Sequence, residues 1–365
     1  MYGNKYLKYF TIKSKQSAER TRDIFVVNPT AAPQRIDAIN PSINVFDYSA
    51  SYLKEVTHTS IESCFEYKEN GHVSWLNIGG LNKQNIESIC QHFGIHFLIV
   101  EDILSVNQRP KMDEMDTVMF CLLNMLYFNE TTGTVETEQI SILLGKDYVI
   151  SFQDDSDRDV FDVLREKIRI STSKLRQSGA DYLCYALLDM IVDHYYIVME
   201  KLGEKIELLE EQIIRFSNTS SLSEINHLRK EMIVLKRNVA PVRELINGFI
   251  RSDSELLEER TTKYFKDVYD HIVQANDLVE NYRDMMINLQ DLYLSNVNLK
   301  MNEVMKVMAI VTCLLAPATV IGGVFGMNFE RIPILHHHYG FYIAVSFMVI
   351  IPIWMLYTFR RRGWF

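Results

Sequence analysis

Two uncharged apolar segments near the C-terminus constrain the fold of this chain most strongly. They are residues 307–325 (VMAIVTCLLAPATVIGGVF) and 339–359 (YGFYIAVSFMVIIPIWMLYTF). Each has about 20 residues, the length that a helix needs to cross a hydrocarbon core of about 30 Å. Only a short loop, 326–338, separates them. We therefore expect two membrane spans that form a hairpin, with both ends of the hairpin on the same side of the membrane.

The distribution of basic residues predicts which side that is. Three arginines follow the second span at 360–362, and Lys300 and Lys306 precede the first span. The loop holds a single arginine, which an adjacent glutamate offsets. Because basic residues accumulate on the cytoplasmic side of spans, we expect both termini in the cytoplasm. The chain is thus predicted to be a multi-pass protein of the cell inner (plasma) membrane, in contact with membrane lipid.

A long stretch without helix-breaking residues precedes the first span. No glycine or proline occurs between Gly248 and Pro317. As one helix with a rise of about 1.5 Å per residue, this stretch would be about 100 Å long. A helix of that length must bury a stripe of side chains against a partner. We expect a long stalk helix that continues into the first membrane span.

Small and polar residues follow one face of this predicted helix at spacings of three, four or seven. This heptad-type stripe is typical of helices that pack around a common axis. Polar members inside a membrane span favour a wet axis, such as a pore. The alternative is close helix packing, which also favours small residues and threonine. The stripe consists of Asp291, Asn298, Asn302, Met305, Ala309, Thr312, Ala316, Thr319 and Gly323.

The N-terminal part has the pattern of an α/β domain. Predicted helices cover 81–93 and 160–175, and a tight hairpin is expected at 145–147. After this domain, an acidic helix and a basic helix are expected to pair as a hairpin. The predicted strands are 43–48, 72–78, 97–101, 117–128, 140–144 and 148–152.

These patterns together predict an α+β membrane protein. The expected segments are a cytoplasmic α/β domain (1–175), a cytoplasmic helical hairpin (176–250), a stalk helix with the first span (251–325, the span at about 307–325), an extracytoplasmic loop (326–338), the second span (339–359) and a basic cytoplasmic tail (360–365).

Composition and missing motifs exclude several classes of function. The net charge of −9 argues against a nucleic-acid binder, which would need a basic face. The five cysteines include no CxxC pair, which argues against a zinc ribbon. The sequence has no P-loop and no hydrolase or dinucleotide motif. We therefore expect no enzyme, no nucleotide and no nucleic acid, and a transporter of this kind must use an ion gradient.

The tripeptide Gly326-Met327-Asn328 follows the first span directly. A helix that ends there directs its unpaired carbonyls and its negative dipole end outward, which attracts cations. Asn328 would add an uncharged amide oxygen. Neutral oxygens suit Mg²⁺, which dehydrates reluctantly and can be held through its waters. The alternative is a GxxxG packing motif formed by Gly322 and Gly326.

The chain resembles the CorA family of magnesium and cobalt transporters over nearly its full length. The tripeptide between two C-terminal spans carries the resemblance, together with the basic tail RRRGWF. Four further segments are also similar to that family: NEVMKVMAIVTCLLAP (302–317), YFKDVYDH (264–271), VEDIL (100–104) and QRPK (108–111).

The resemblance implies a funnel-shaped homopentamer in which the stalk helices enclose the pore. Gly326, Met327 and Asn328 would form the selectivity filter for hydrated Mg²⁺. The resemblance places Asn302, Met305, Ala316 and Thr319 in the pore, Asp291 in a cytoplasmic ring, and Met305 and Met308 near a hydrophobic constriction. It also implies that Glu101, Asp102 and Asp267 bind regulatory Mg²⁺ between subunits. Bound Mg²⁺ would bridge facing carboxylates and close the pore, which is feedback inhibition.

Two departures from the family pattern leave the identity of the ion open. Phe325 stands where the family commonly has tyrosine, and the loop carries a histidine run at 336–338. Imidazole groups bind Co²⁺, Ni²⁺ or Zn²⁺, although a solvated loop is the alternative. The expected function is a passive Mg²⁺ channel, with Co²⁺ and Ni²⁺ as further candidate ions. The alternatives are a transition-metal transporter of the same architecture and a membrane-anchored sensor that conducts nothing.

Overall fold

The computed structural model describes residues 38, 41–58, 60–106, 108–115, 117–154, 158–215, 219–327 and 337–364. The chain divides into two compact units. The first consists of Met1–Glu210 and Leu222–Asn288, and the second of Glu211–Ser221 and Leu289–Phe365. The first unit contains the sheet, and the second contains the predicted membrane spans.

A seven-stranded mixed sheet forms the centre of the first unit, with the strand order β2-β1-β3-β7-β6-β5-β4. Only β3 and β7 pair in parallel among these strands, and their neighbours pair antiparallel. The long β5–β6 hairpin and the short β6–β7 hairpin follow the chain order. The strands are β1 Ser42–Tyr48, β2 Leu53–His58, β3 Val73–Gly79, β4 Lys111–Met115, β5 Val118–Asn129, β6 Thr134–Leu144 and β7 Tyr148–Gln153.

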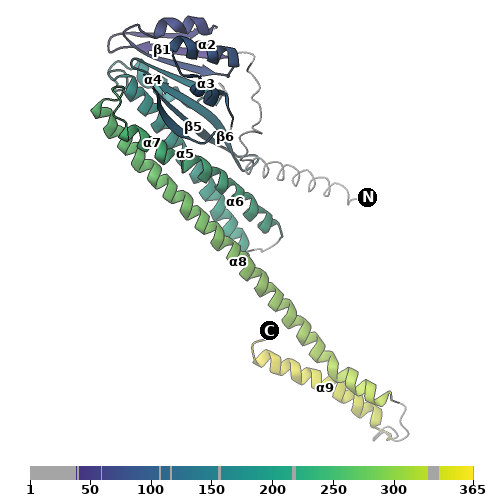
Figure 1. Cartoon of the computed structure of the whole chain (residues 1–365). Helices are drawn as coiled ribbons and strands as arrows, with labels where there is room; N and C mark the ends of the chain where they lie inside the picture. Colours follow the sequence, from purple (N-terminus) through teal and green to yellow (C-terminus); the bar gives the residue numbers. More distant parts are fainter. Residues whose placement is uncertain are drawn as a thin grey trace. The chain divides into compact units, whose positions relative to one another are not determined.

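Helices cover both faces of the sheet (Figure 1). On one face lie η2 Ile61–Tyr67, α2 Lys83–Phe93 and α3 Phe97–Leu104, which share a buried core with β3, β5 and β7. On the other face lie α4 Asp162–Arg169 and α5 Ala180–Arg215. There Trp75 packs edge-on against Phe161, and the Tyr195 hydroxyl donates to the Asn124 carbonyl at 2.7 Å. Burial on both faces explains why the central strands are continuous apolar runs.

The structure corrects three details of the predicted domain. The prediction of a strand at 97–101 is wrong, because this segment forms α3. Ile99 and Ile103 are buried one turn apart, and the His96 ring accepts from the Leu98 N–H at the helix start. Helix α4 ends at Arg169 rather than near residue 175. Strands β2 and β4, both at the sheet edges, were not predicted.

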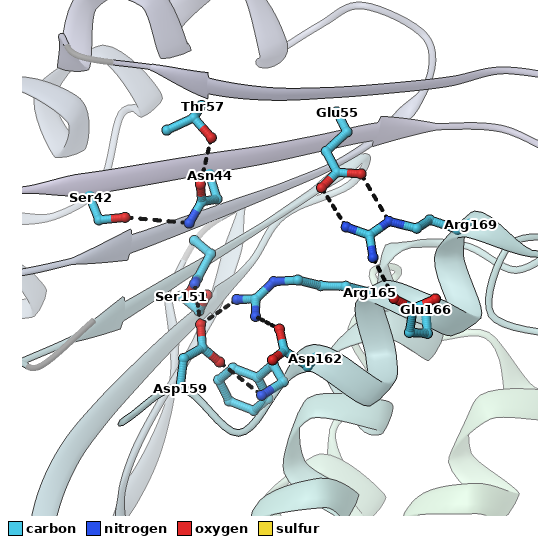
Figure 2. Close-up of polar contacts among 12 residues, drawn as sticks. Ser42, Asn44, Glu55, Thr57, Ser151, Asp159, Asp162, Arg165, Glu166 and Arg169 are labelled. Carbon is cyan, nitrogen blue, oxygen red and sulfur yellow. Dashed lines mark hydrogen bonds and ion pairs between the residues drawn. The ribbon is translucent and has the colours of Figure 1, made fainter. Parts of the chain in front are cut away.

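Charged side chains fix α4 on the sheet (Figure 2). Arg165 forms ion pairs with Asp159 and Asp162. Arg169 donates to both carboxylate oxygens of Glu55 on β2, at 2.6 and 3.0 Å. Each guanidinium also lies over an aromatic ring of the sheet. These contacts account for the arginines on the face of a helix that otherwise packs apolar side chains.

Helix α5 runs beside the first part of α8 Glu259–Phe325 (Figure 1). The Tyr196 hydroxyl of α5 donates to the His271 carbonyl of α8 at 2.6 Å. The predicted basic helix is divided into α6 Thr219–Val239 and α7 Val242–Arg251, with Pro241 between them. Lys236 of α6 forms an ion pair with Glu280 of α8.

The second unit contains the predicted membrane spans. Helix α8 is uninterrupted over 67 residues and passes through Pro317, and α9 covers Gly340–Arg361. Within the described residues, two helices, α8 and α9, are long and apolar enough to cross a membrane, and their apolar windows are almost entirely exposed. The predicted class is confirmed: an α/β domain, a long helix and a C-terminal apolar helix. Helix α8 begins at Glu259 rather than at 251 as predicted, because 252–258 is irregular and includes a turn after α7.

Candidate pore and metal-binding sites

The predicted pore residues all lie on α8, and every one of them is exposed in the single chain. The hydroxyls of Thr312 and Thr319 donate to the carbonyls one turn earlier, at 2.9 and 3.1 Å. Their oxygens keep free lone pairs that can accept from water or bind a hydrated cation. The predicted set is Asp291, Asn298, Asn302, Met305, Met308, Thr312, Ala316, Thr319 and Gly323.

The first two residues of the tripeptide follow α8 directly and form a turn at its C-terminal end. The Gly326 N–H donates to the Gly322 carbonyl at 2.9 Å, and the Met327 N–H to the Val324 carbonyl at 3.4 Å. A Cβ on Gly326 would lie 3.1 Å from the Gly322 carbonyl oxygen, so glycine suits this tight turn. Asn328 lies outside the described residues, as do Glu330, Arg331 and His336. The role of the Asn328 amide at the pore mouth is therefore a prediction from the sequence.

Asp102 is the predicted regulatory residue with the most developed surroundings. It lies on α3, with a side chain that is 17% exposed. Its Oδ2 accepts from the Lys111 Nζ at 2.6 Å, and the same ammonium lies 3.0 Å from Asp113 Oδ2. Neighbouring Glu101 is exposed and lines a surface groove of about 630 Å³. Within one chain, Asp102 is thus paired with a lysine.

Asp267 lies on α8 beside a cluster that the sequence analysis missed. Asp189 and Asp193 are one turn apart on α5 and face His271 of α8, which follows Asp267 by one turn. One ligand atom from each of Asp189, Asp193 and His271 lies within 4.8 Å of the others. The Tyr185 hydroxyl donates to Asp189 Oδ2 at 3.2 Å. Two carboxylates and an imidazole are a donor set that fits a first-row transition metal.

Electrostatics make this cluster a favourable place for a cation. Burial raises the pKa of Asp189, and repulsion from Asp193 and Asp267 raises it further. The same repulsion disfavours three ionised carboxylates without a counter-ion, and a divalent cation would relieve it. The Nδ1 atom of His271 is buried, has no hydrogen-bond partner among the described residues, and lies 4.0 Å from Asp193 Oδ1.

The pattern that could have revealed the cluster is the acid pair DxxxD at 189–193, since residues four apart share one helix face. Its partner His271 could not be assigned without the packing of α5 on α8. His194, the neighbour of Asp193, is by contrast a packed histidine. Its ring makes an edge contact with Tyr127, and burial lowers its pKa.

Comparisons with known proteins agree with this architecture. The family model described as "CorA-like Mg2+ transporter protein" matches residues 70–361. The "Cobalt/magnesium transport protein CorA" of Thermotoga maritima is 36% identical over 323 residues, which cover 88% of this chain and 92% of that protein.

Two solved structures have the same fold. That of the CorA magnesium transporter from Methanocaldococcus jannaschii matches with a TM-score of 0.73 and 21% identity, covering 90% of this chain and 100% of that one. That of the full-length CmaX protein matches with a TM-score of 0.65 and 16% identity, covering 91% and 99% of the two chains.

Proposed function

The chain belongs to the family of CorA-like Mg²⁺ transporters, and on this premise we propose that it is a passive Mg²⁺ channel. In this proposal, five identical subunits surround one pore in the cell inner membrane. The residues at 326–338 face outward and both termini lie in the cytoplasm. Proteins of this family transport divalent cations, and the ion, the pentamer and the gating are the parts that we propose.

One observation carries the proposal: the polar stripe on α8 is exposed within an apolar helix. Asn302, Thr312 and Thr319 are exposed, and no other element of the described part of the chain covers them. A polar side chain that faces lipid is unfavourable, whereas one that faces a water-filled axis is solvated. Copies of α8 packed around an axis would turn this stripe inward and leave the apolar side chains for the lipid and α9.

The selectivity filter is proposed to be Gly326-Met327-Asn328. An amide oxygen from each subunit would hold the waters of Mg²⁺ without removing them. The test is the Asn328→Ala variant in liposomes with an imposed membrane potential. We expect uptake of Mg²⁺ to fall at least tenfold, while Ile170→Ala, an exposed change in the α/β domain, leaves it unaltered. Unchanged uptake by Asn328→Ala would show that the tripeptide is not the filter.

The membrane potential is a sufficient driving force for this activity. It supplies about 2.3 kcal/mol per elementary charge at 100 mV, hence about 4.6 kcal/mol for a divalent cation. At about 1.4 kcal/mol per tenfold, this corresponds to accumulation of roughly a thousandfold. Inward movement of Mg²⁺ therefore needs no nucleotide. Flux that persists with the potential collapsed and no concentration gradient would contradict a passive channel.

Regulation is proposed to depend on Glu101, Asp102 and Asp267. Mg²⁺ bound between these carboxylates of neighbouring subunits would hold the cytoplasmic domains together and close the pore. Asp267→Lys places a tethered positive charge where the cation would bind. We expect this variant to lose inhibition by internal Mg²⁺ and protection from proteolysis by Mg²⁺. Full Mg²⁺ protection in Asp267→Lys would remove this residue from the proposed site.

A second candidate function is transport of transition metals by the same architecture. The observation that favours it is the imidazole of His271 within reach of Asp189 and Asp193. Competition between Mg²⁺ and Co²⁺, Ni²⁺ or Zn²⁺ in the liposome assay separates the two candidates. Preferential uptake of Zn²⁺ would replace Mg²⁺ as the cargo. Absence of any metal-dependent flux would favour the non-conducting sensor instead.

A further inference from the structure

The backbone that carries Asp102 is held by a side chain that the proposed function does not use. The buried side chain of Gln139, on β6, directs its Nε2 at the carbonyls of Asp102 and Ile103, at 3.3 Å from each. This contact joins the C-terminal end of α3 to the sheet. The backbone that carries Asp102 is therefore anchored, and adjustment at this position falls to side chains.

The side chain of Lys111 forms an ion pair with the carboxylate of Asp102. It lies on the edge strand β4, two residues before Asp113, so both side chains project from the same face of the strand. The Lys111 ammonium lies between the two acids, 2.6 Å from Asp102 Oδ2 and 3.0 Å from Asp113 Oδ2. A protonated amine therefore occupies the proposed regulatory carboxylate.

We propose that Lys111 is a built-in competitor of the regulatory cation at Asp102, and that Asp113 accepts the lysine when the cation binds. This inference rests on the proposed role of Asp102 in Mg²⁺ regulation. At low Mg²⁺, the ammonium neutralises Asp102. At high Mg²⁺, the divalent ion takes the Asp102 oxygens and Lys111 pairs with Asp113 alone. The lysine–aspartate pair thereby sets the Mg²⁺ concentration at which the transporter closes.

The geometry makes this exchange inexpensive. A lysine is a compact charge on a flexible four-carbon stem, so it can change partners without movement of the backbone. Its second partner is already within 3.0 Å, so the displaced charge does not lose its ion pair. A partly exposed ion pair of this kind contributes little to stability. We therefore expect its loss to change the binding constant for Mg²⁺ about threefold. An effect of that size adjusts the threshold without abolishing metal binding.

The test measures the Mg²⁺ concentration that gives half-maximal protection of the full-length protein from proteolysis. Lys111→Met removes the charge and retains most of the stem, and we expect it to lower the midpoint about threefold. Lys111→Arg retains the charge and is expected to leave the midpoint at or above that of the wild type. An unchanged or raised midpoint for Lys111→Met would overturn the proposal.

A double-mutant comparison isolates the role of Asp113. We expect Asp113→Asn to raise the midpoint about threefold, because the displaced lysine then lacks its second acceptor. In the Lys111→Met background, the same change should have little effect. An equal rise in both backgrounds would mean that Asp113 attracts cations directly, and would overturn the exchange.

Asp102→Asn separates this inference from the function on which it rests. The proposed function predicts that this variant loses most of its Mg²⁺ protection. If it does and the Lys111→Met midpoint is unaltered, Asp102 regulates and the competition is wrong. If Asp102→Asn keeps the wild-type midpoint, the regulatory site itself is wrong. Thermal unfolding of each variant in EDTA verifies that the fold is intact.

Discussion

Phe265 anchors the beginning of α8 to the rest of the first unit. Its side chain is fully buried. The ring stacks on Phe249 of α7 with a centroid distance of 4.8 Å and meets Tyr185 of α5 edge-on at 6.0 Å. Phe265→Ala would remove both aromatic contacts at once. It would also leave a cavity where α5, α7 and α8 meet.

The expected loss of stability follows from this burial. Truncation of a buried phenylalanine to alanine costs about 3–5 kcal/mol, because the transfer free energy is lost and a cavity remains. In a domain of this size, each kcal/mol lowers the melting temperature by about 2 °C. We therefore expect Phe265→Ala to melt about 6–10 °C below the wild type. Phe265→Leu, which fills part of the cavity, should lose less than half as much.

The assay is thermal unfolding of the purified full-length protein in EDTA, followed by circular dichroism and by tryptophan fluorescence, to which buried Trp75 contributes. The control is Ile170→Ala, where the side chain is 54% exposed, and its melting temperature should change by less than about 2 °C. If Phe265→Ala melts no lower than Ile170→Ala, the contact with α7 and α5 does not stabilise the unit, and the argument from burial is refuted.

Two further predictions concern the same unit. Gly145→Ala should lower the melting temperature by several degrees (about 1–3 kcal/mol), because the new Cβ would lie 2.2 Å from Cζ of the buried Tyr148 ring. An unaltered melting temperature would show that the ring can move. Asp189→Asn tests the raised pKa of this carboxyl. Above the ordinary pKa of 3.8, the folded state binds more protons than the unfolded chain, so the contribution of Asp189 to the free energy of unfolding falls as pH rises. The advantage of Asp189→Asn in chemical unfolding with EDTA should therefore grow from pH 4 to pH 7, and a difference independent of pH would contradict the assignment.

Elements whose sequence pattern admits one structure were predicted correctly. The two apolar segments have the length and lack of charge of a membrane-spanning helix, and they form the end of α8 and α9. Most of the stretch without glycine or proline became one helix, which begins at Glu259 and which Pro317 does not interrupt. Strands β3, β5 and β7 were found because long apolar runs bounded by polar turns fit strands that are buried on both faces.

Elements with an ambiguous pattern needed the tertiary structure. The run FLIVEDIL at Phe97–Leu104 is short and apolar enough for a strand or a helix, and it is helical because Ile99 and Ile103 meet the core under α2. Edge strands β2 and β4 are polar on one side and carry few apolar residues, so no periodicity marked them. Local preference is weak in such segments, and long-range packing determines their conformation.

The sequence by itself determined the class of this protein: a membrane hairpin, a stalk helix with a polar stripe, and the tripeptide at the end of the first span. It did so because the length of an apolar run and the period of a stripe are local properties. The tertiary structure alone decided which charged groups meet. Asp189 and His271 are 82 residues apart, and Lys111 reaches Asp102 only because α3 packs on the sheet edge. Electrostatic contacts act over a few ångströms in space, and the order of residues along a chain does not specify that separation.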